Sequence, residues 1–509
     1  MKKIGVESSG HILKEGTLKK KKYESKEKVE VILCESKKIG GENKKRLEEE
    51  LKKENIKIVR HDERGIRIMG EIKDIERIFD IEFNEYETKQ GEKYRGFEGI
   101  PNVYEYIHDN IEAIIGLSNE KIGDSLIKTN KKNRINKNTL DNEVKEQAVI
   151  KKFYTPLDLA NLYKFPKTGI VKGKNVVLNG ANQNVAIIEL GGGYLQSDLN
   201  KYFNYLGVPI PKVIPLSVDG AVNSPGTNIE LDKETTLDIQ VVGAIVPKST
   251  ILVYFAPNTS IGIYDAIYDA AFNKKYPTSI ISFSYEIPEN ILSGSLLNAY
   301  NNLIFNCRAK GVNLFCGAGD RGYTDGVSVN RAVATFPSTS PNAVSCGGTT
   351  LTSTATTIIS EVVWNNNPNT SATGGGVSSY FGKPPYQAPY AVPLNPNNRL
   401  RGRGFPDVSA HANPENGYLI YFQGNFEIVG GTSASTPLWA GLTTRLNQSF
   451  GGSIGFLNKL LYRYCSQGNY CLNDITVGNN GLYVAHKSWD PCTGLGSPDG
   501  IKIYNAMHK

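Results

Sequence analysis

The chain has 509 residues, too many for one ordinary hydrophobic core, so we expect two or more domains. Its net charge of +7 is unevenly built, because the first 150 residues hold 32 basic and 30 acidic side chains and the rest hold 26 and 21. Neither part is basic enough to indicate nucleic-acid binding, and no run of about 18 apolar residues indicates a membrane span.

The N-terminus is basic but lacks an apolar region, so no secretory signal is legible. The seven cysteines are odd in number and include no C-x-x-C pair, which argues against a zinc site or a dense disulfide framework. Cys465 and Cys471 are close enough in sequence to pair, but spacing alone does not decide whether they do.

Residues 1–118 form the first predicted domain, with the pattern of a small α+β unit from residue 14 onward. Charged stretches at 44–53 and 72–79 predict helices with one solvated face. Strand-like segments lie at 29–34, 56–59, 65–70 and 111–117.

Residues 119–152 form a segment rich in Lys and Asn, with a basic run from Lys128 to Arg134. It has few apolar residues, which predicts an exposed linker. Exposed linkers are preferred sites of proteolysis, so we expect a cut here.

Residues 153–509 have a different texture, with near-continuous apolar runs separated by helical patterns. The apolar runs lie at 185–190, 250–255, 279–284 and 312–317, and the helical patterns at 235–246, 261–273 and 295–308. Buried strands that alternate with helices indicate a parallel sheet covered on both faces. Functional side chains of such folds gather at the carboxyl ends of the strands.

Three acidic residues stand out. Glu234 and Asp238 are four residues apart in a predicted helix, which places them on one face, about 5–6 Å apart at Cβ. Two such carboxylates share protons and titrate as a unit. Asp320 directly follows a predicted buried strand, where its ordinary interpretation is a turn aspartate.

The stretch 430–437 predicts a glycine-containing turn that presents the Ser433 hydroxyl at the start of a buried helix. Ordinary helix capping is the alternative interpretation. A histidine base is poorly supported, because His411, His486 and His508 are expected at the surface. If Ser433 is activated, a carboxylate must do it.

The order Glu234, Asp238, Asp320, Ser433, with Gly-Thr-Ser-Ala-Ser-x-Pro around the serine, resembles the sedolisin (serine-carboxyl peptidase) family, and most of all its kumamolisins. Further segments that carry the resemblance are 154–159, 188–194, 254–259, 373–378 and 405–408. The resemblance implies a subtilisin-like α/β fold, a parallel sheet with helices on both faces, preceded by a small α+β activation prodomain.

The resemblance also implies the roles of these residues. Ser433 would attack the scissile carbonyl, Glu234 would take its proton, and Asp238 would orient Glu234. Asp320 would be the oxyanion-hole carboxyl, which must be protonated to donate a hydrogen bond. A carboxylic acid is neutral only at low pH or in a strongly perturbing site, so an acidic optimum follows.

Glu189 and Tyr285 would belong to a supporting network. Kumamolisins have Ser-Trp-Gly where this chain has Ser284, Tyr285 and Glu286. Tyr285 keeps an aromatic ring with a polar tip, which preserves the substrate wall. Glu286 adds a charge that bears on subsite preference.

One structural Ca²⁺ near the C-terminus is implied as well. The matching ligands are the side chains of Asp474 and Asp490 and the carbonyl groups of Ile475, His486 and Ser488. His486 and Ser488 replace glycines of the family pattern, and carbonyl ligation survives if φ and ψ permit.

Together these features and the resemblance predict a monomeric endopeptidase that acts on polypeptides and is made as a self-processing proenzyme with its prodomain as intramolecular inhibitor. The resemblance alone implies that it is extracellular. Protonation of prodomain carboxylates near about pH 4 would release it. The rivals are an inactive, calcium-stabilised scaffold and a neutral subtilisin-type protease. The first would not need Ser433, and the second would need a histidine base.

Overall fold

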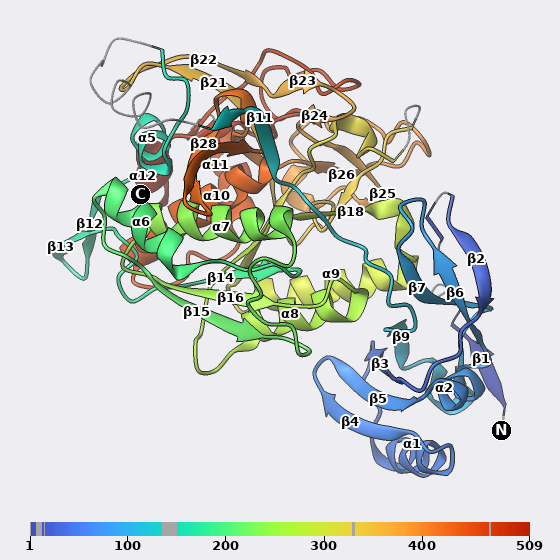
Figure 1. Ribbon diagram of the computed structural model, residues 1–509. Helices are drawn as coiled ribbons and strands as arrows, with labels where there is room; N and C mark the ends of the chain where they lie inside the picture. Colours follow the sequence, from blue (N-terminus) through green and yellow to red (C-terminus); the bar gives the residue numbers. More distant parts are fainter. Residues whose placement is uncertain are drawn as a thin grey trace. The chain divides into compact units, whose positions relative to one another are not determined.

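The computed structural model describes residues 2–6, 13–14, 16–134, 150–327, 331–467 and 470–508, with the side chains of 130–134 excepted. The chain divides into two compact units (Figure 1). The first comprises residues 1–123, 257–268 and 290–303, and the second comprises 124–256, 269–289 and 304–509. No helix in the described ranges is both long and apolar enough to cross a bilayer.

The first unit is built on an antiparallel sheet with two amphipathic helices, as the sequence pattern predicts for residues 14–118. The sheet order is β4 (Lys57–Asp62), β5 (Gly65–Glu71), β3 (Lys28–Glu35) and β9 (Ile111–Ile115). The helices are α1 (Gly41–Lys53) and α2 (Ile72–Phe79). Helix α2 buries Ile75, Ile78 and Phe79 on one face, which is the helical period that the sequence shows.

The second unit is organised around an eight-stranded sheet. Its order is β15 (Lys212–Ser217), β16 (Thr250–Phe255), β14 (Asn184–Glu189), β17 (Ile280–Phe283), β19 (Asn313–Gly317), β21 (Val344–Ser353) and β22 (Ile358–Val363), with β27 (Val408–His411) beside β21. All pairings are parallel except that between β21 and β22. Strands buried on both faces need continuous apolar runs, and β14, β16, β17 and β19 have them.

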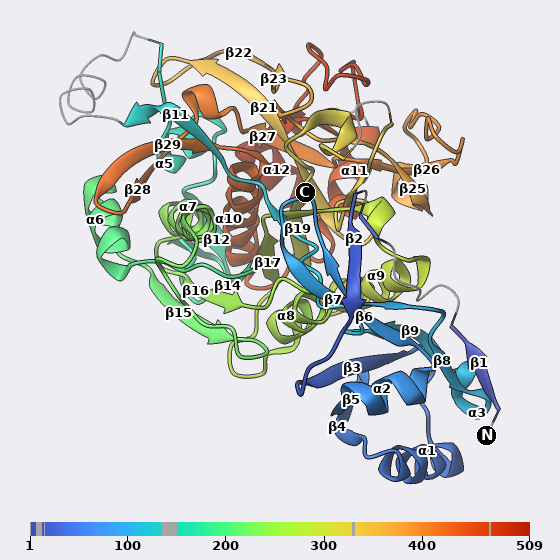
Figure 2. The ribbon, with the colours of Figure 1, turned by 45° about the vertical axis from the view of Figure 1, so that its right-hand side comes forward.

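Helices pack against this sheet. Helix α10 (Thr432–Phe450) contacts β17, β19 and β21, and α7 (Ile229–Ile245) contacts β14 and β16. The two helices also contact each other, and Figures 1 and 2 show them side by side. The remaining helices of eight or more residues in the described ranges are α6 (Gln196–Leu206), α8 (Ser260–Phe272), α9 (Gly294–Ala309), α11 (Leu457–Ser466) and α12 (Gly500–Met507). The expected α/β class, a parallel sheet flanked by helices, is confirmed.

The parallel register brings three strand ends to one edge of the sheet. Glu189 is the last residue of β14, Ser284 follows β17, and Asp320 follows β19. Ile188 pairs with Phe283, and Phe283 pairs with Cys316, so the ends lie level. Side chains that are far apart in sequence therefore converge at this edge.

The prediction of an exposed linker over 119–152 is wrong for Leu126 and Ile127 and their neighbouring strands, while Asn119, Lys121 and residues 150 and 152 are exposed. Strand β10 (Asp124–Ser125) pairs with β18 (Tyr285–Pro288), and β11 (Lys128–Arg134) pairs with β29 (Asn425–Gly430), as Figure 2 shows for β11. Leu126 and Ile127, between the two strands, are buried. Two apolar residues inside a polar segment gain free energy by burial, and this decides the path. Residues 135–149 lie outside the described part.

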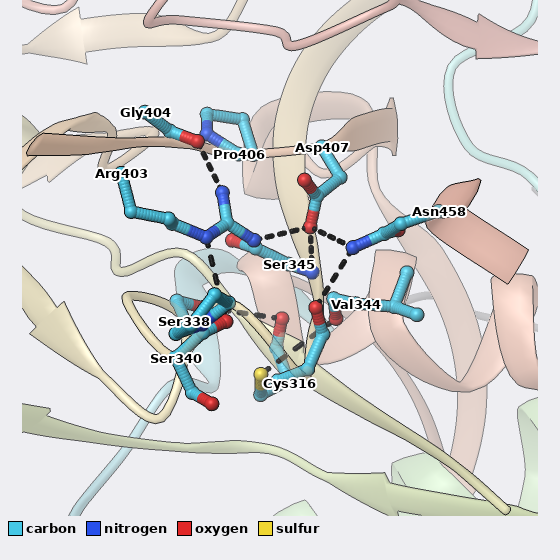
Figure 3. Close-up of polar contacts among 12 residues, drawn as sticks. Cys316, Ser338, Ser340, Val344, Ser345, Arg403, Gly404, Pro406, Asp407 and Asn458 are labelled. Atoms are coloured by element: carbon cyan, nitrogen blue, oxygen red, sulfur yellow. Dashed lines mark hydrogen bonds and ion pairs between the residues drawn. The ribbon is translucent and has the colours of Figure 1, made fainter. Parts of the chain in front are cut away.

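A buried ion pair between Arg403 and Asp407 lies at the sheet of the second unit (Figure 3). Arg403 and Asp407 are fully buried, with 2.5 Å between Nη2 and Oδ2. Asp407 also accepts hydrogen bonds from Ser345 N, Asn458 Nδ2 and the Tyr462 hydroxyl. These three partners lie in β21 and α11, and they satisfy a charge that would otherwise be costly to bury.

Candidate active site

Helix α7 carries two of the predicted acidic residues into the interior. The helix begins at an N-cap in which the Asn228 side chain accepts from the backbone N–H groups of Glu230 and Leu231. Glu234 and Asp238 are both fully buried, one helical turn apart. Their face of the helix is therefore enclosed by protein, where a carboxylate is costly unless it is paired or protonated.

Glu234 meets two hydroxyl groups. Burial raises its pKa to about 8, while hydrogen bonds from Ser125 and Ser433 work in the opposite direction. The Ser125 hydroxyl donates to Glu234 Oε2 at 2.5 Å. Oε1 is buried without a hydrogen-bond partner among the described residues. Glu234 is thus placed between the linker and Ser433.

Asp238 and Glu189 extend the acidic group. The Ser284 hydroxyl donates to Asp238 Oδ2 at 2.8 Å, and the Tyr285 hydroxyl donates to Glu189 Oε2 at 2.9 Å. Burial raises the pKa of both carboxyls well above the ordinary range, and the neighbouring acidic side chains raise it further. Together with Glu234 they share protons, because three buried carboxylates this close cannot all be charged.

Asp320 has one oxygen fixed and one unpartnered. Its Oδ1 accepts from Thr432 N and from Thr432 Oγ1, each at 2.8 Å. Its Oδ2 is buried without a partner in the described part of the chain. Burial raises the pKa of Asp320 to about 7; the Lys128 charge opposes this shift and the Glu286 charge adds to it. A protonated Oδ2 at this position can donate a hydrogen bond.

Ser433 is the second residue of α10 and is fully buried. Its Oγ lies 3.5 Å from the Ser284 carbonyl oxygen. The turn before it depends on Gly431, whose φ of +101° favours glycine. A Cβ at Gly431 would overlap the Leu126 carbonyl oxygen and Asp320 Oδ2. The glycine therefore lets a peptide backbone approach the serine and the acid at once.

The linker lies in this site, which sequence reasoning missed. Ser125 pairs with Tyr285, Asp124 pairs with Glu286, and the Leu126 N–H donates to the Ser284 carbonyl at 3.3 Å. The one signal in the sequence is the pair of apolar residues at 126–127 in a segment that is otherwise polar.

The three histidines that were considered as a base, His411, His486 and His508, contact none of the site residues in the hydrogen bonds of the described structure. His411 was expected at the surface, and this is wrong: it is fully buried, and burial lowers its pKa to about 4. Its ring nitrogens contact the backbone at Leu351 and Asn416, which explains why a histidine can be buried there. His486 and His508 are exposed.

The predicted calcium ligands lie together near the C-terminus. Asp474 Oδ2 accepts from Ser488 N at 2.9 Å, and Asp474 Oδ1 is buried without a partner among the described residues. Asp490 accepts from the N–H groups of Cys492 and Thr493, and burial raises its pKa to about 6.

The backbone at this locus bears on the expected carbonyl ligands. Ser488 has a φ of +72°, a backbone conformation that favours glycine. The family pattern has glycine at this position. Ile475 is buried and His486 is exposed. No group of three or more His, Cys, Asp or Glu side chains within the described ranges is placed to hold a metal, so backbone carbonyls would have to complete a site. An unpartnered buried carboxylate oxygen on Asp474 fits a cation.

All seven cysteines lie in the described residues and are buried and unpaired. Cys465 Sγ and Cys471 Sγ are 3.9 Å apart, which is longer than a disulfide bond.

The structure brings together six of the predicted site residues: Glu189, Glu234, Asp238, Tyr285, Asp320 and Ser433. Their roles in catalysis stay a prediction. Glu234 and Asp238 were predicted from helical spacing, Asp320 from its place after a buried strand, Ser433 from turn chemistry, and Glu189 and Tyr285 from the family resemblance. The parallel register brings the ends of β14, β17 and β19 to one edge of the sheet, and α7 and α10 supply Glu234, Asp238 and Ser433.

Comparison with known proteins gives three informative matches, while no family model matches the chain. It is 38% identical over 448 residues to kumamolisin of Bacillus sp. (strain MN-32), covering 86% of this chain and 78% of that protein. It is 30% identical over 346 residues to sedolisin of Pseudomonas sp. (strain 101), covering 64% of this chain and 57% of that one. A solved Pseudomonas sedolisin (serine-carboxyl proteinase), complexed with two molecules of pseudo-iodotyrostatin, superimposes with a TM-score of 0.61 at 26% identity, over 70% of this chain and 98% of that one. These matches confirm the expected subtilisin-like fold class.

Proposed function

This chain belongs to the sedolisin family and is a serine-type peptidase, and from that premise we propose that it is an acid-active serine-carboxyl endopeptidase made as a proenzyme. The observation that carries the proposal is the meeting of Ser433, Glu234 and Asp320 Oδ2 around one peptide segment. A nucleophile, a base and an oxyanion donor are the three parts that peptide hydrolysis needs.

In this mechanism the Ser433 hydroxyl attacks the scissile carbonyl carbon while Glu234 takes its proton. Asp238 is a positioning residue, since it acts through Glu234 and is itself held by Ser284. Asp320, protonated, donates from Oδ2 to the developing oxyanion. Glu234 then returns the proton to the leaving nitrogen, and water hydrolyses the resulting ester by the same path in reverse.

An acidic pH optimum is supported by the way in which the linker covers Glu234 and Asp320. Burial is the largest cause of the raised pKa of both Glu234 and Asp320, and the linker is part of what covers them. When the linker leaves, water returns and both pKa values fall toward the ordinary range near 4. Because kcat/KM depends on the free enzyme, Glu234 ionised and Asp320 protonated then coexist best in acid.

Endopeptidase activity is supported by the course of the linker. The segment pairs with β18 before Leu126 and with β29 after Ile127, so peptide lies on both sides of Ser433. A site that admits chain on both sides can cut within a polypeptide. We therefore propose polypeptide substrates, a self-cut in residues 119–152, and residues 1–118 as intramolecular inhibitor.

Release of residues 1–118 is supported by an ion-pair cluster within the first compact unit. Asp265 is buried and binds three guanidinium groups, those of Arg60, Arg64 and Arg67. Removal of the Asp265 carboxylate would leave these cations without the anion that they share. Loss of these ion pairs would loosen residues 57–71 from α8.

We also propose one structural Ca²⁺, held by Asp474 and Asp490 with carbonyls of Ile475, His486 and Ser488. The ion would neutralise two buried carboxylates and so stabilise the C-terminal loops. A chelator should lower the melting temperature of the wild type and have less effect on Asp474→Asn. The protein is proposed to be monomeric and, from the family resemblance, extracellular.

The experiment that tests the function uses the Ser433→Ala chain. Wild type at about pH 4 should cut itself and an unfolded protein substrate, and Ser433→Ala should do neither. Ser435→Ala is the matched control, since this buried serine on the same helix bonds only the Thr432 carbonyl in the described structure. Equal behaviour of Ser433→Ala and wild type would favour the inactive scaffold, and activity peaking above about pH 7 would favour the neutral protease.

A further inference from the structure

The linker enters the site in a defined register on both sides of one peptide bond. Before the bond, Asp124 and Ser125 pair with Glu286 and Tyr285 of β18. After it, Lys128 and Thr129 pair with Gly430 and Val429 of β29. The bond between Leu126 and Ile127 is held between these two strands.

The Leu126 carbonyl oxygen lies beside Asp320 and the turn that precedes Ser433. It lies where a Cβ of Gly431 would be, and Asp320 Oδ2 borders the same point. The Ser284 carbonyl oxygen lies 3.3 Å from Leu126 N and 3.5 Å from Ser433 Oγ, so the nucleophile and the Leu126 backbone share a neighbour. Asp320 Oδ2 is buried without a partner among the described residues. When protonated, it could donate a hydrogen bond to the Leu126 carbonyl oxygen.

The side chains of the segment fit the enclosure around them. Leu126 is fully buried, and its Cδ1 lies where a Cβ of Gly317 would be. The space at Gly317 therefore accepts an aliphatic side chain and would strip the water from a charged one. Ser125 bonds to Glu234 at 2.5 Å.

An arginine contacts the acidic residue two positions before Leu126. Arg321 Nη1 lies 3.6 Å from Asp124 Oδ2, and Arg321 Nη2 lies 3.4 Å from Glu286 Oε1. Because Asp124 and Glu286 are cross-strand partners of like charge, their pairing needs the cation between them. Gly326 provides the room, since a Cβ there would overlap Arg321 Cδ.

We propose that the chain makes its first self-cut at the Leu126–Ile127 bond, and that Arg321 is a specificity-determining residue for an acidic side chain at the third residue before the cut. The inference rests on the proposed peptidase function. Ser433 Oγ bonds to the Leu126 carbonyl carbon, the bond to the Ile127 nitrogen breaks, and the Ser433 proton passes through Glu234 to that nitrogen. Water then hydrolyses the ester, leaving a Leu126 carboxylate and free Ser433.

The first test follows the full chain in acid over time by intact mass and N-terminal sequencing. The earliest products should end at Leu126 and begin at Ile127, and Leu126→Asp should abolish this cut. A first cut elsewhere that still requires Ser433 would overturn the inference and leave the peptidase function standing. Absence of any Ser433-dependent cut, in the chain or in an unfolded substrate, would overturn both.

The second test uses processed enzyme and a synthetic peptide of residues 120–131 at pH 5, where an aspartate in a peptide is ionised. Cleavage should fall between Leu126 and Ile127. An Asp124→Asn peptide should be cut about two- to fivefold more slowly, the range of an exposed ion pair, while the Glu120→Gln control keeps the wild-type rate.

The same peptides given to Arg321→Gln enzyme separate recognition from folding. The ratio of the cleavage rate of the wild-type peptide to that of the Asp124→Asn peptide should fall toward one in this variant. A ratio that stays at its value for wild-type enzyme would overturn the role of Arg321, whatever the absolute rate.

Discussion

At the scale of single residues, the two carboxyl oxygens of Asp320 have different surroundings. Oδ1 is fixed by the Thr432 backbone and hydroxyl, and Oδ2 is buried without a hydrogen-bond partner among the described residues. The fixed oxygen keeps the side chain from turning, so a proton on Oδ2 points at a defined place. Such pre-orientation is the main source of oxyanion stabilisation.

Replacing Asp320 separates hydrogen-bond donation from titration. Asp320→Ala should lower kcat by about 10²–10³, the typical cost of one oxyanion donor. Asp320→Asn can donate without a titrating proton, so it should retain part of the activity. In the wild type, Asp320 loses its proton as pH rises, and activity should fall with it. The Asn variant has no such proton to lose, so its activity should fall less steeply at high pH. Identical pH profiles for Asn variant and wild type would exclude Asp320 as the titrating donor.

At the scale of elements, the candidate site is made by the middle of α7, the beginning of α10 and the segments at the ends of β14, β17 and β19. The helices bring side chains at helical spacing, and the strands bring residues that follow their last apolar position. The turn into α10 is the narrowest part, since Gly431 lies against both Asp320 and the linker.

Gly431→Ala should block self-processing. A Cβ there meets the Leu126 carbonyl oxygen and Asp320, and a φ of +101° is unfavourable for alanine. The rate of the first cut, measured by intact mass, should fall at least about 100-fold, the cost of a reacting group misplaced by about 1 Å. Gly451→Ala, at a positive φ of +70° beyond the other end of α10, is the control and should cut at the wild-type rate. Normal processing in Gly431→Ala would contradict the placement of Leu126.

At the scale of the whole molecule, carboxyl groups are used in opposite ways. Glu189, Glu234, Asp238 and Asp320 are buried with raised pKa values, so the folded state favours their neutral forms. Asp265 is also buried, but it forms ion pairs with three arginines.

Because these buried carboxyl groups have raised pKa values, we expect the uncut protein to be more stable at low pH. Glu234 has a pKa raised from 4.5 to about 8, so its contribution is complete below about pH 4.5 and is lost as pH rises through 8. Thermal melts of Ser433→Ala should show stability falling by about 1–4 kcal/mol from this group between pH 4.5 and 8. The double variant with Glu234→Gln should show a smaller fall. Equal falls in both proteins would contradict the raised pKa.

Asp265→Asn should allow processing at higher pH than wild type, because it removes the anion that three arginines share. The measurement is the pH at which half of the chain is cut in a fixed time. Glu112→Gln is the control, since it alters a contact with the uncharged Asn302 in the same compact unit. If the half-point does not move in Asp265→Asn, this cluster does not govern release.

The sequence alone determined the fold class of this protein and the local structure around its candidate site residues. Apolar runs and helical periods predicted the α/β class, i,i+4 spacing put Glu234 and Asp238 on one face, and turn chemistry put Ser433 at a helix start. The tertiary structure decided that these groups meet, because strand order and register are set by contacts between distant segments. It also decided that Leu126 and Ile127 are buried at Ser433 and that His411 is internal, since burial depends on what the rest of the chain supplies as cover.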